Sequence, residues 1–130
     1  MRVRGPFDVE LKPIGEEEEW GGFGRLGLDK RFHGPLEGTS RGQMIAARTE
    51  IENSAAYVAV ERVTATLQGR AGTFVLVHQG LMDRGRDSLR VIVVPDSGTG
   101  ALAGISGTMN IVIEPDGSHF YELDYVLPER

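Results

Sequence analysis

The sequence has no cysteine among its 130 residues. This absence excludes disulfide bonds, thiolate catalysis and zinc sites built on thiolates. Lysine is scarce as well, with only Lys12 and Lys30, and the arginines are scattered rather than gathered into a basic stripe. Nucleic acid is therefore not expected as a partner. Runs resembling a signal peptide or a membrane span are also missing, so we expect a cytoplasmic protein with no membrane partner.

Length and composition indicate a single soluble domain covering residues 1–130. Apolar residues make up 40% of the chain and charged residues 25%, as in ordinary globular proteins. Four of the acidic residues behind the net charge of −5 lie together in Glu16–Glu19, which we interpret as a solvated loop. The 18 glycines are spread along the chain, which favours many short strands joined by tight turns.

Alternation of apolar and polar residues predicts about eight strands and almost no helix. We expect the strands at about residues 7–12, 26–32, 36–48, 57–68, 73–81, 89–94, 109–113 and 119–127. Segment 50–56 is interpreted as a connection with room for one helical turn, and segment 89–94 as a strand buried on both faces. So many closely spaced strands favour a closed, mostly antiparallel eight-stranded β-barrel over a sandwich.

Two glycines lie in the inward lane of the strand at 36–48. Gly38 and Gly42 either open space inside the barrel or permit the coiling that barrel closure requires. The glycine-rich run Gly98–Gly104 is interpreted as part of a turn-rich cap at one barrel end, with room for one short helix within 95–107. The histidines are far apart and show no metal-binding spacing, so we predict neither a metal site nor a cofactor.

The strand from Tyr57 to Gln68 places an acidic residue in an apolar lane. Successive strand residues point to opposite faces, so Glu61 points inward with Ala59 and Val63. A carboxylate in that position is either paired or held for a purpose, because burying an unpaired charge is costly. It is either a general acid or base, or the partner of Lys30 in a buried ion pair.

Further polar residues converge on the same interior if these lanes are correct. His78 shares a lane with Phe74, and the last strand places His119, Tyr121 and Tyr125 on one face. A glutamate or histidine in a dry pocket can be tuned toward neutral pH for acid–base work, and tyrosine hydroxyls can donate to a developing oxyanion. In the structural alternative, the histidines are satisfied core groups and the tyrosine hydroxyls complete an ion pair.

Several runs of the sequence resemble a known family. They are Lys30-x-Phe32-x-Gly34-x-Leu36-x-Gly38-x-Ser40, Tyr57-x-x-x-Glu61, Gly69-Arg70-x-Gly72-Thr73-Phe74-Val75-Leu76-x-His78-x-Gly80, Val93-Val94-Pro95-x-Ser97-Gly98-Thr99-Gly100-x-Leu102-x-Gly104 and His119-x-Tyr121-x-x-x-Tyr125. Together they resemble short bacterial proteins known only as a domain of unknown function, similar in fold to the allene oxide cyclase barrel and to plant dirigent proteins.

The resemblance implies a closed eight-stranded antiparallel barrel and no established activity. Proteins of the similar fold act on small hydrophobic or phenolic molecules, steering cyclisation or coupling without a metal or organic cofactor. They often form trimers or other homo-oligomers. Carrying these properties over is an analogy of fold, which does not by itself establish function.

We therefore predict a barrel that binds a small hydrophobic molecule in its lumen. If it is an enzyme, we expect a cofactor-free isomerase or cyclase in which Glu61 moves a proton and His78 or Tyr121 polarises an oxygen. The expected ligand-binding residues are Lys30, His119, Tyr125, Tyr57, Phe74 and Trp20.

The alternatives to this function are a non-catalytic carrier and a structural or oligomeric interaction protein. In the last case the strand at 89–94 would lie at the interface between copies. The substitution Glu61→Gln separates these hypotheses. A strained functional carboxylate predicts unchanged or higher stability, whereas a structural ion pair predicts a loss of roughly a few kcal/mol.

Overall fold

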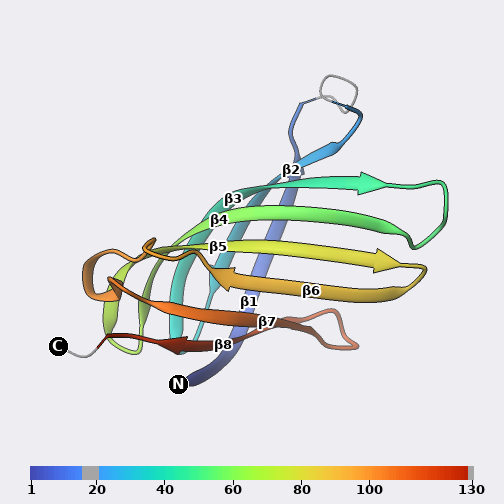
Figure 1. Ribbon diagram of the computed structural model, residues 1–130. Coiled ribbons are helices and arrows are strands. Elements are labelled where there is room, and N and C mark those ends of the chain that lie inside the picture. The colour runs from blue at the N-terminus through green and yellow to red at the C-terminus, as the bar shows by residue number, and fades with distance from the viewer. Residues whose placement is uncertain (16–20, 129–130) are drawn as a thin grey trace.

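The chain folds into a closed β-barrel in which every strand pairs antiparallel with the next and β8 pairs with β1 (Figure 1). The computed structural model describes residues 1–15 and 21–128, so Trp20 lies outside the described residues. The strands are β1 (Arg2–Pro13), β2 (Gly24–Phe32), β3 (Leu36–Arg48), β4 (Ala55–Leu67), β5 (Arg70–Asp83), β6 (Arg86–Val93), β7 (Ser106–Ile113) and β8 (His119–Val126). The predicted all-β, eight-stranded antiparallel barrel is confirmed.

One local prediction holds in part and another was wrong. The connection expected at 50–56 is present without a helical turn: the Thr49 hydroxyl donates to the Ser54 carbonyl at 2.9 Å, and β4 already begins at Ala55. The strand at 89–94 is not buried on both faces. Leu89 keeps 38% of its surface exposed, and only Val91 and Val93 are buried, because the first part of β6 extends beyond the packed core.

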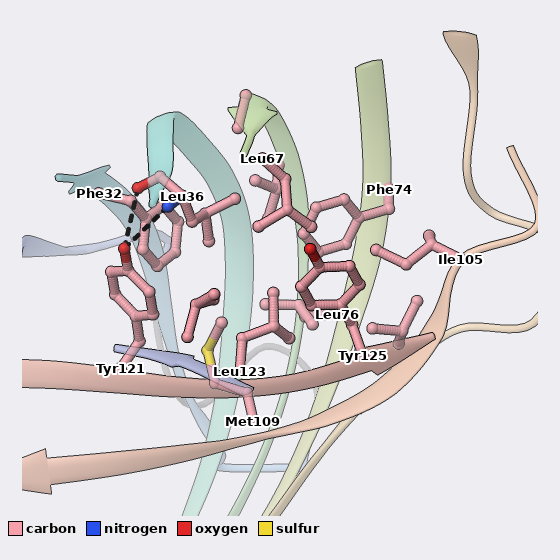
Figure 2. Packing of buried hydrophobic residues seen from close by; sticks show 14 of the residues in the cluster. Phe32, Leu36, Leu67, Phe74, Leu76, Ile105, Met109, Tyr121, Leu123 and Tyr125 are labelled. Carbon is pink, nitrogen blue, oxygen red and sulfur yellow. Dashed lines mark hydrogen bonds between the residues drawn. The ribbon is translucent and has the colours of Figure 1, made fainter. Parts of the chain in front are cut away.

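One half of the barrel interior is filled by its own side chains (Figure 2). Fully buried residues from five strands meet there, including Leu36, Leu67, Phe74, Leu76 and Leu123. The expected cap covers this end: the segment between β6 and β7 carries the short 3₁₀ helix η2 (Gly100–Leu102), and its Leu102 and Ile105 are buried in the same cluster. We refer to this part of the barrel as the packed half.

The other half of the barrel is not filled in the same way, and we refer to it as the open half. Its inward lanes carry apolar side chains that stay partly or largely exposed, although they point to the inside of the barrel. These residues are Leu11, Leu26, Met44, Tyr57 and Leu89.

The barrel is closed most weakly between β6 and β7. Their ladder contains two residue pairs, Val91 with Met109 and Ile92 with Thr108. Beyond these pairs the two strands diverge toward the open half (Figure 1). The closure therefore lies near the packed half.

The two inward glycines of β3 allow close approach of strand backbones. A Cβ atom at Gly42 would lie 2.0 Å from the Val60 carbonyl oxygen, and one at Gly38 would lie 2.2 Å from the Thr64 carbonyl oxygen. Any side chain at either position would push β3 away from β4. Of the two roles predicted for these glycines, coiling of the barrel wall is the one that these contacts support.

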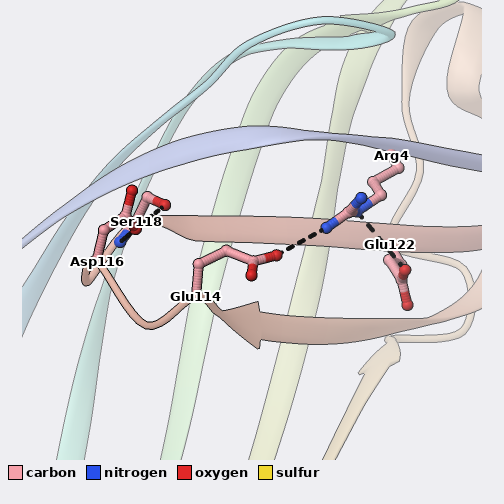
Figure 3. A network of polar contacts seen from close by, with 5 residues as sticks. All are labelled: Arg4, Glu114, Asp116, Ser118 and Glu122. Carbon is pink, nitrogen blue, oxygen red and sulfur yellow. Dashed lines mark hydrogen bonds and ion pairs between the residues drawn. The ribbon is translucent and has the colours of Figure 1, made fainter.

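The β7–β8 hairpin closes in a turn in which the Gly117 amide donates to the Glu114 carbonyl at 2.9 Å. Asp116 accepts hydrogen bonds from the Ser118 backbone amide at 2.9 Å and the Ser118 hydroxyl at 2.5 Å (Figure 3). Arg4 of β1 forms ion pairs with Glu114 and with Glu122 of β8, with N–O distances of 3.2 and 3.7 Å. These pairs are solvent-exposed, so each contributes at most about 1 kcal/mol to stability.

Candidate functional site

Four polar side chains from four neighbouring strands meet inside the barrel, between the packed and open halves. The Glu61 carboxylate of β4 is at their centre and is 1% exposed. Its Oε1 accepts a hydrogen bond from the Ser40 hydroxyl at 2.6 Å. Its Oε2 lies 2.8 Å from Lys30 Nζ and 2.5 Å from His78 Nε2. Lys30, Ser40 and His78 are themselves buried. We call these four residues the Glu61 cluster.

Strand register explains why these four residues meet. Lys30 of β2 is paired with Ser40 of β3, and Glu61 of β4 is paired with Gly42, two residues further along β3. Because Gly42 has no side chain, the long Lys30 side chain can reach Glu61 across the intervening strand, a span of about 10 Å between backbones. His78 is diagonal to Glu61, at a separation that long side chains can bridge.

The surroundings of Glu61 stabilise its ionised form. Burial alone would raise the pKa of this carboxyl, but the hydrogen bond to His78 and the charges of Lys30 and His78 outweigh burial. Together they lower the pKa of Glu61 from 4.5 to about 2. The tuning toward neutral pH that a proton carrier requires is therefore not found at Glu61, and the side chain stays an anion at physiological pH.

The ionised carboxylate fixes which nitrogen of His78 carries a proton. A carboxylate can only accept hydrogen bonds, so His78 Nε2 must be the N–H donor at 2.5 Å. His78 Nδ1 has no hydrogen bond within residues 1–15 and 21–128. No buried side-chain nitrogen or oxygen there lacks a partner, so Nδ1 keeps contact with solvent. Nδ1 has a free lone pair only in the neutral ring, in which the charge of His78 that also lowers the pKa of Glu61 is absent.

Comparison with protein families identifies the group to which the chain belongs. A family model described as "Protein of unknown function (DUF3224)" matches residues 3–125. The chain is a member of the DUF3224 family. A crystal structure of a DUF3224 protein of unknown function from Shewanella oneidensis MR-1 is 45% identical and superposes with a TM-score of 0.92. The match covers 100% of this chain and 98% of that one. A search of curated proteins gives no match.

This DUF3224 barrel matches the unknown-function family that the sequence was predicted to resemble. The similarity to the allene oxide cyclase barrel stays a prediction. So do the activity, the ligand and the oligomeric state that we considered by analogy with that fold.

Three predicted site residues lie in the packed half, away from the Glu61 cluster. The buried Tyr121 hydroxyl contacts the His33 carbonyl oxygen at 2.6 Å and accepts a hydrogen bond from the Leu36 amide at 3.0 Å. It thereby holds the β2–β3 turn (Figure 2). Tyr125 donates to the Gln68 side chain, and Phe74 is fully buried core. The contacts of all three are structural, and their roles at a ligand stay predictions.

Two other expected ligand-binding residues, Tyr57 and His119, are nearer to the open half. Tyr57 is half-buried, and its ring packs against Gly80, where an added Cβ would lie 2.2 Å from the ring. His119 is also half-buried, and its ring centroid is 5.3 Å from that of Phe7. The Phe7 ring centroid lies 5.3 Å from Lys30 Nζ, so an aromatic face covers one side of the buried ammonium.

Sequence reasoning missed Ser40 and Phe7 as parts of this site. Both are in inward lanes, and Ser40 is the only hydroxyl residue in its lane of β3. The inward position of Ser40 could have indicated its role, because a polar residue in an inward lane requires a hydrogen-bond partner. The signal for Phe7 was weaker, since an inward phenylalanine is ordinary core.

The described residues offer no evident place for a metal ion. Within 1–15 and 21–128, no group of three or more histidine, cysteine, aspartate or glutamate side chains is arranged to hold one. Nor does this part of the chain contain a helix with the length and apolar character needed to span a bilayer.

Proposed function

We propose that this DUF3224 protein binds a small, largely apolar molecule in the open half of its barrel, with the Glu61 cluster at the inner end of the site. The observation that carries the proposal is the contrast between the two halves of the interior. Inward apolar side chains are fully buried in the packed half, yet Leu11 and Leu89 in the open half keep 47% and 38% of their surface exposed. Covering these inward surfaces would be favourable by the hydrophobic effect.

A pocket at the same end of the barrel supports this location. It has a volume of about 260 Å³ and includes the inward-lane residues Leu26 and Ala46, with Arg25 and Arg48 beside them. Ligand sites in proteins are typically concave and apolar with a few polar groups. The pocket alone would take a small molecule, and the arginines would suit a ligand with a carbonyl or acidic group.

Two neighbouring residues of β3 provide a matched test. Met44 points inward in the open half, whereas Ile45 points outward and is 45% exposed. We expect the neutral apolar dye N-phenyl-1-naphthylamine to bind saturably, with enhanced fluorescence. Met44→Arg should abolish this binding, and Ile45→Arg should leave it unchanged. The ¹³C-methyl NMR signal of Met44 should respond to the dye, whereas that of the exposed Met1 should not. Saturable binding that survives Met44→Arg would contradict a lumen site.

A second candidate function is assembly through the outer face of the barrel. Ile45, Val58 and Val60 form an apolar patch on the outer lanes of β3 and β4, with exposed fractions of 45%, 50% and 54%. Exposed apolar patches of this kind often mark interaction surfaces. This function predicts that the mass in solution exceeds that of one chain and falls in Ile45→Arg but not in Met44→Arg. The expected cytoplasmic location also belongs to the proposal and is tested by cell fractionation.

A further inference from the structure

We infer that His78 is a general base, which would make the barrel a catalyst of proton transfer at carbon. The candidate substrate class is a small apolar ketone with a hydrogen on the carbon next to its carbonyl. This inference rests on the proposed binding of an apolar molecule in the open half. It assigns the proton-moving role predicted for Glu61 to His78 and makes Glu61 a positioning residue.

The first support is the arrangement of the His78 ring. Its Nε2 is held 2.5 Å from a carboxylate that is buried and also contacted by Ser40 and Lys30. These contacts fix both the orientation of the ring and the nitrogen that carries the proton. A histidine oriented in this way by a carboxylate presents its second nitrogen as a base. In this protein that nitrogen is Nδ1.

The second support is that Nδ1 has no hydrogen bond to residues 1–15 and 21–128, on a side chain that is only 4% exposed. Because this nitrogen keeps contact with solvent, it is open to a bound molecule rather than tied into the core. The open half, with its partly exposed apolar lining, is on the same inner side of the barrel wall. An apolar molecule bound there would therefore lie on the same side of the wall as the His78 ring.

The proposed step balances without a cofactor or an oxidant. His78 Nδ1 takes the proton from the carbon next to the carbonyl, and the electrons of that C–H bond form a C=C bond. The carbonyl π electrons move to oxygen, where Lys30 is the buried cation of the cluster. The imidazolium then returns a proton to the same carbon, or to the far end of a conjugated system. Return of a proton to the same carbon is hydrogen exchange, and protonation at the far end of the conjugated system is isomerisation.

Exchange of carbon-bound hydrogen in D₂O tests the inference without knowledge of the natural substrate. We would incubate the full chain with cyclohexanone, 2-tetralone or 2-decalone and follow deuterium uptake by NMR. At least one ketone should exchange at least about tenfold faster than with an equal concentration of imidazole, since positioned bases typically give 10²–10⁴-fold. His78→Gln should lose this acceleration. The matched variant His33→Gln should keep it, because His33 pairs with the exposed Asp8 instead.

The outcomes separate this inference from the proposed function. If the Met44 methyl signal responds to a ketone while exchange is no faster than with imidazole, ligand binding stands and the inference fails. If His78→Gln retains the full acceleration, His78 is not the base. If none of the three ketones shifts the Met44 signal or exchanges faster, both the inference and the binding of such molecules are overturned. The wild-type comparison with imidazole holds even if His78→Gln does not fold.

A spectroscopic measurement tests the positioning role of Glu61. The ¹⁵N ring signals of His78 should show the pattern of a ring protonated at Nε2. In Glu61→Gln that pattern should be lost together with the acceleration of exchange. Loss of exchange with the ring pattern unchanged would contradict the positioning role of Glu61.

Discussion

The Lys30 ammonium of β2 lies 2.8 Å from the Glu61 carboxylate of β4, although β3 separates the two strands. Both side chains are almost fully buried. Removing one partner of such a pair leaves an uncompensated charge in the interior, at a cost of about 3–5 kcal/mol. We expect Lys30→Met and Glu61→Gln each to lower the free energy of unfolding by that order, measured by urea denaturation at pH 7.

The double variant Lys30→Met/Glu61→Gln should cost less than the sum of the single variants, because each single variant leaves a lone buried charge and the double variant removes both charges of the pair. The exposed pair Arg2–Asp124 is the matched control, and Arg2→Met should cost under about 1 kcal/mol. Equal effects of Lys30→Met and Arg2→Met would contradict the role given to burial. A loss of stability in Glu61→Gln counts against Glu61 as the proton carrier. It leaves the assignment of the base to His78 open to test.

The lowered pKa of Glu61 predicts a specific dependence of stability on pH. Its folded-state value of about 2 lies below the ordinary value of 4.5, so the unfolded chain takes up this proton first as pH falls. The contribution is complete above about pH 5 and is lost progressively toward pH 2. It amounts to about 3 kcal/mol. Unfolding of the wild type and of Glu61→Gln should be compared at pH 6 and pH 3. The free energy of unfolding of Glu61→Gln should fall less between pH 6 and pH 3 than that of the wild type. An equal fall in both proteins would contradict the lowered pKa of Glu61.

Alternation along single strands was enough to favour the barrel and to predict the inward position of Glu61 and Lys30. It left the direction of His78 open, because both lanes of the strand at 73–81 are apolar. It could not show which inward residues share a level of the barrel, since that depends on register between strands and on closure. Tyr121 was therefore grouped with Glu61, although it lies in the packed half at the β2–β3 turn. For the same reason Ser40 was not predicted as a partner of the Lys30–Glu61 ion pair. Its contact with Glu61 depends on how β3 and β4 are aligned, which a single strand does not show.

Tyr121→Phe tests the structural role that the contacts give to this hydroxyl. The substitution leaves the ring but removes the partner of the Leu36 amide and of the His33 carbonyl. Leaving such buried groups unsatisfied costs about 1–3 kcal/mol. Tyr57→Phe is a suitable control, because its half-buried hydroxyl has no hydrogen bond within the described residues. The denaturation midpoint should fall in Tyr121→Phe and stay nearly constant in Tyr57→Phe. A similar midpoint in both would show that the turn does not depend on this hydroxyl.

Gly42→Ala tests whether close approach of β3 and β4 is what assembles the Glu61 cluster. The new Cβ would lie 2.0 Å from the Val60 carbonyl oxygen and 2.6 Å from the Glu61 Cα. These are backbone atoms, so relief requires β3 to move, which would displace Lys30 and Ser40 from the carboxylate. We expect a loss of at least about 3 kcal/mol, in the range of severe changes in a packed interior. The His78 ring ¹⁵N signals should also change.

Gly27→Ala on β2 is the control, since its Cβ would meet the Ile14 side chain at 3.4 Å. Its effect should be within about 1 kcal/mol, and it should favour stability because alanine is less flexible than glycine in the unfolded chain. A fully stable Gly42→Ala with unchanged His78 signals would contradict this account of the cluster.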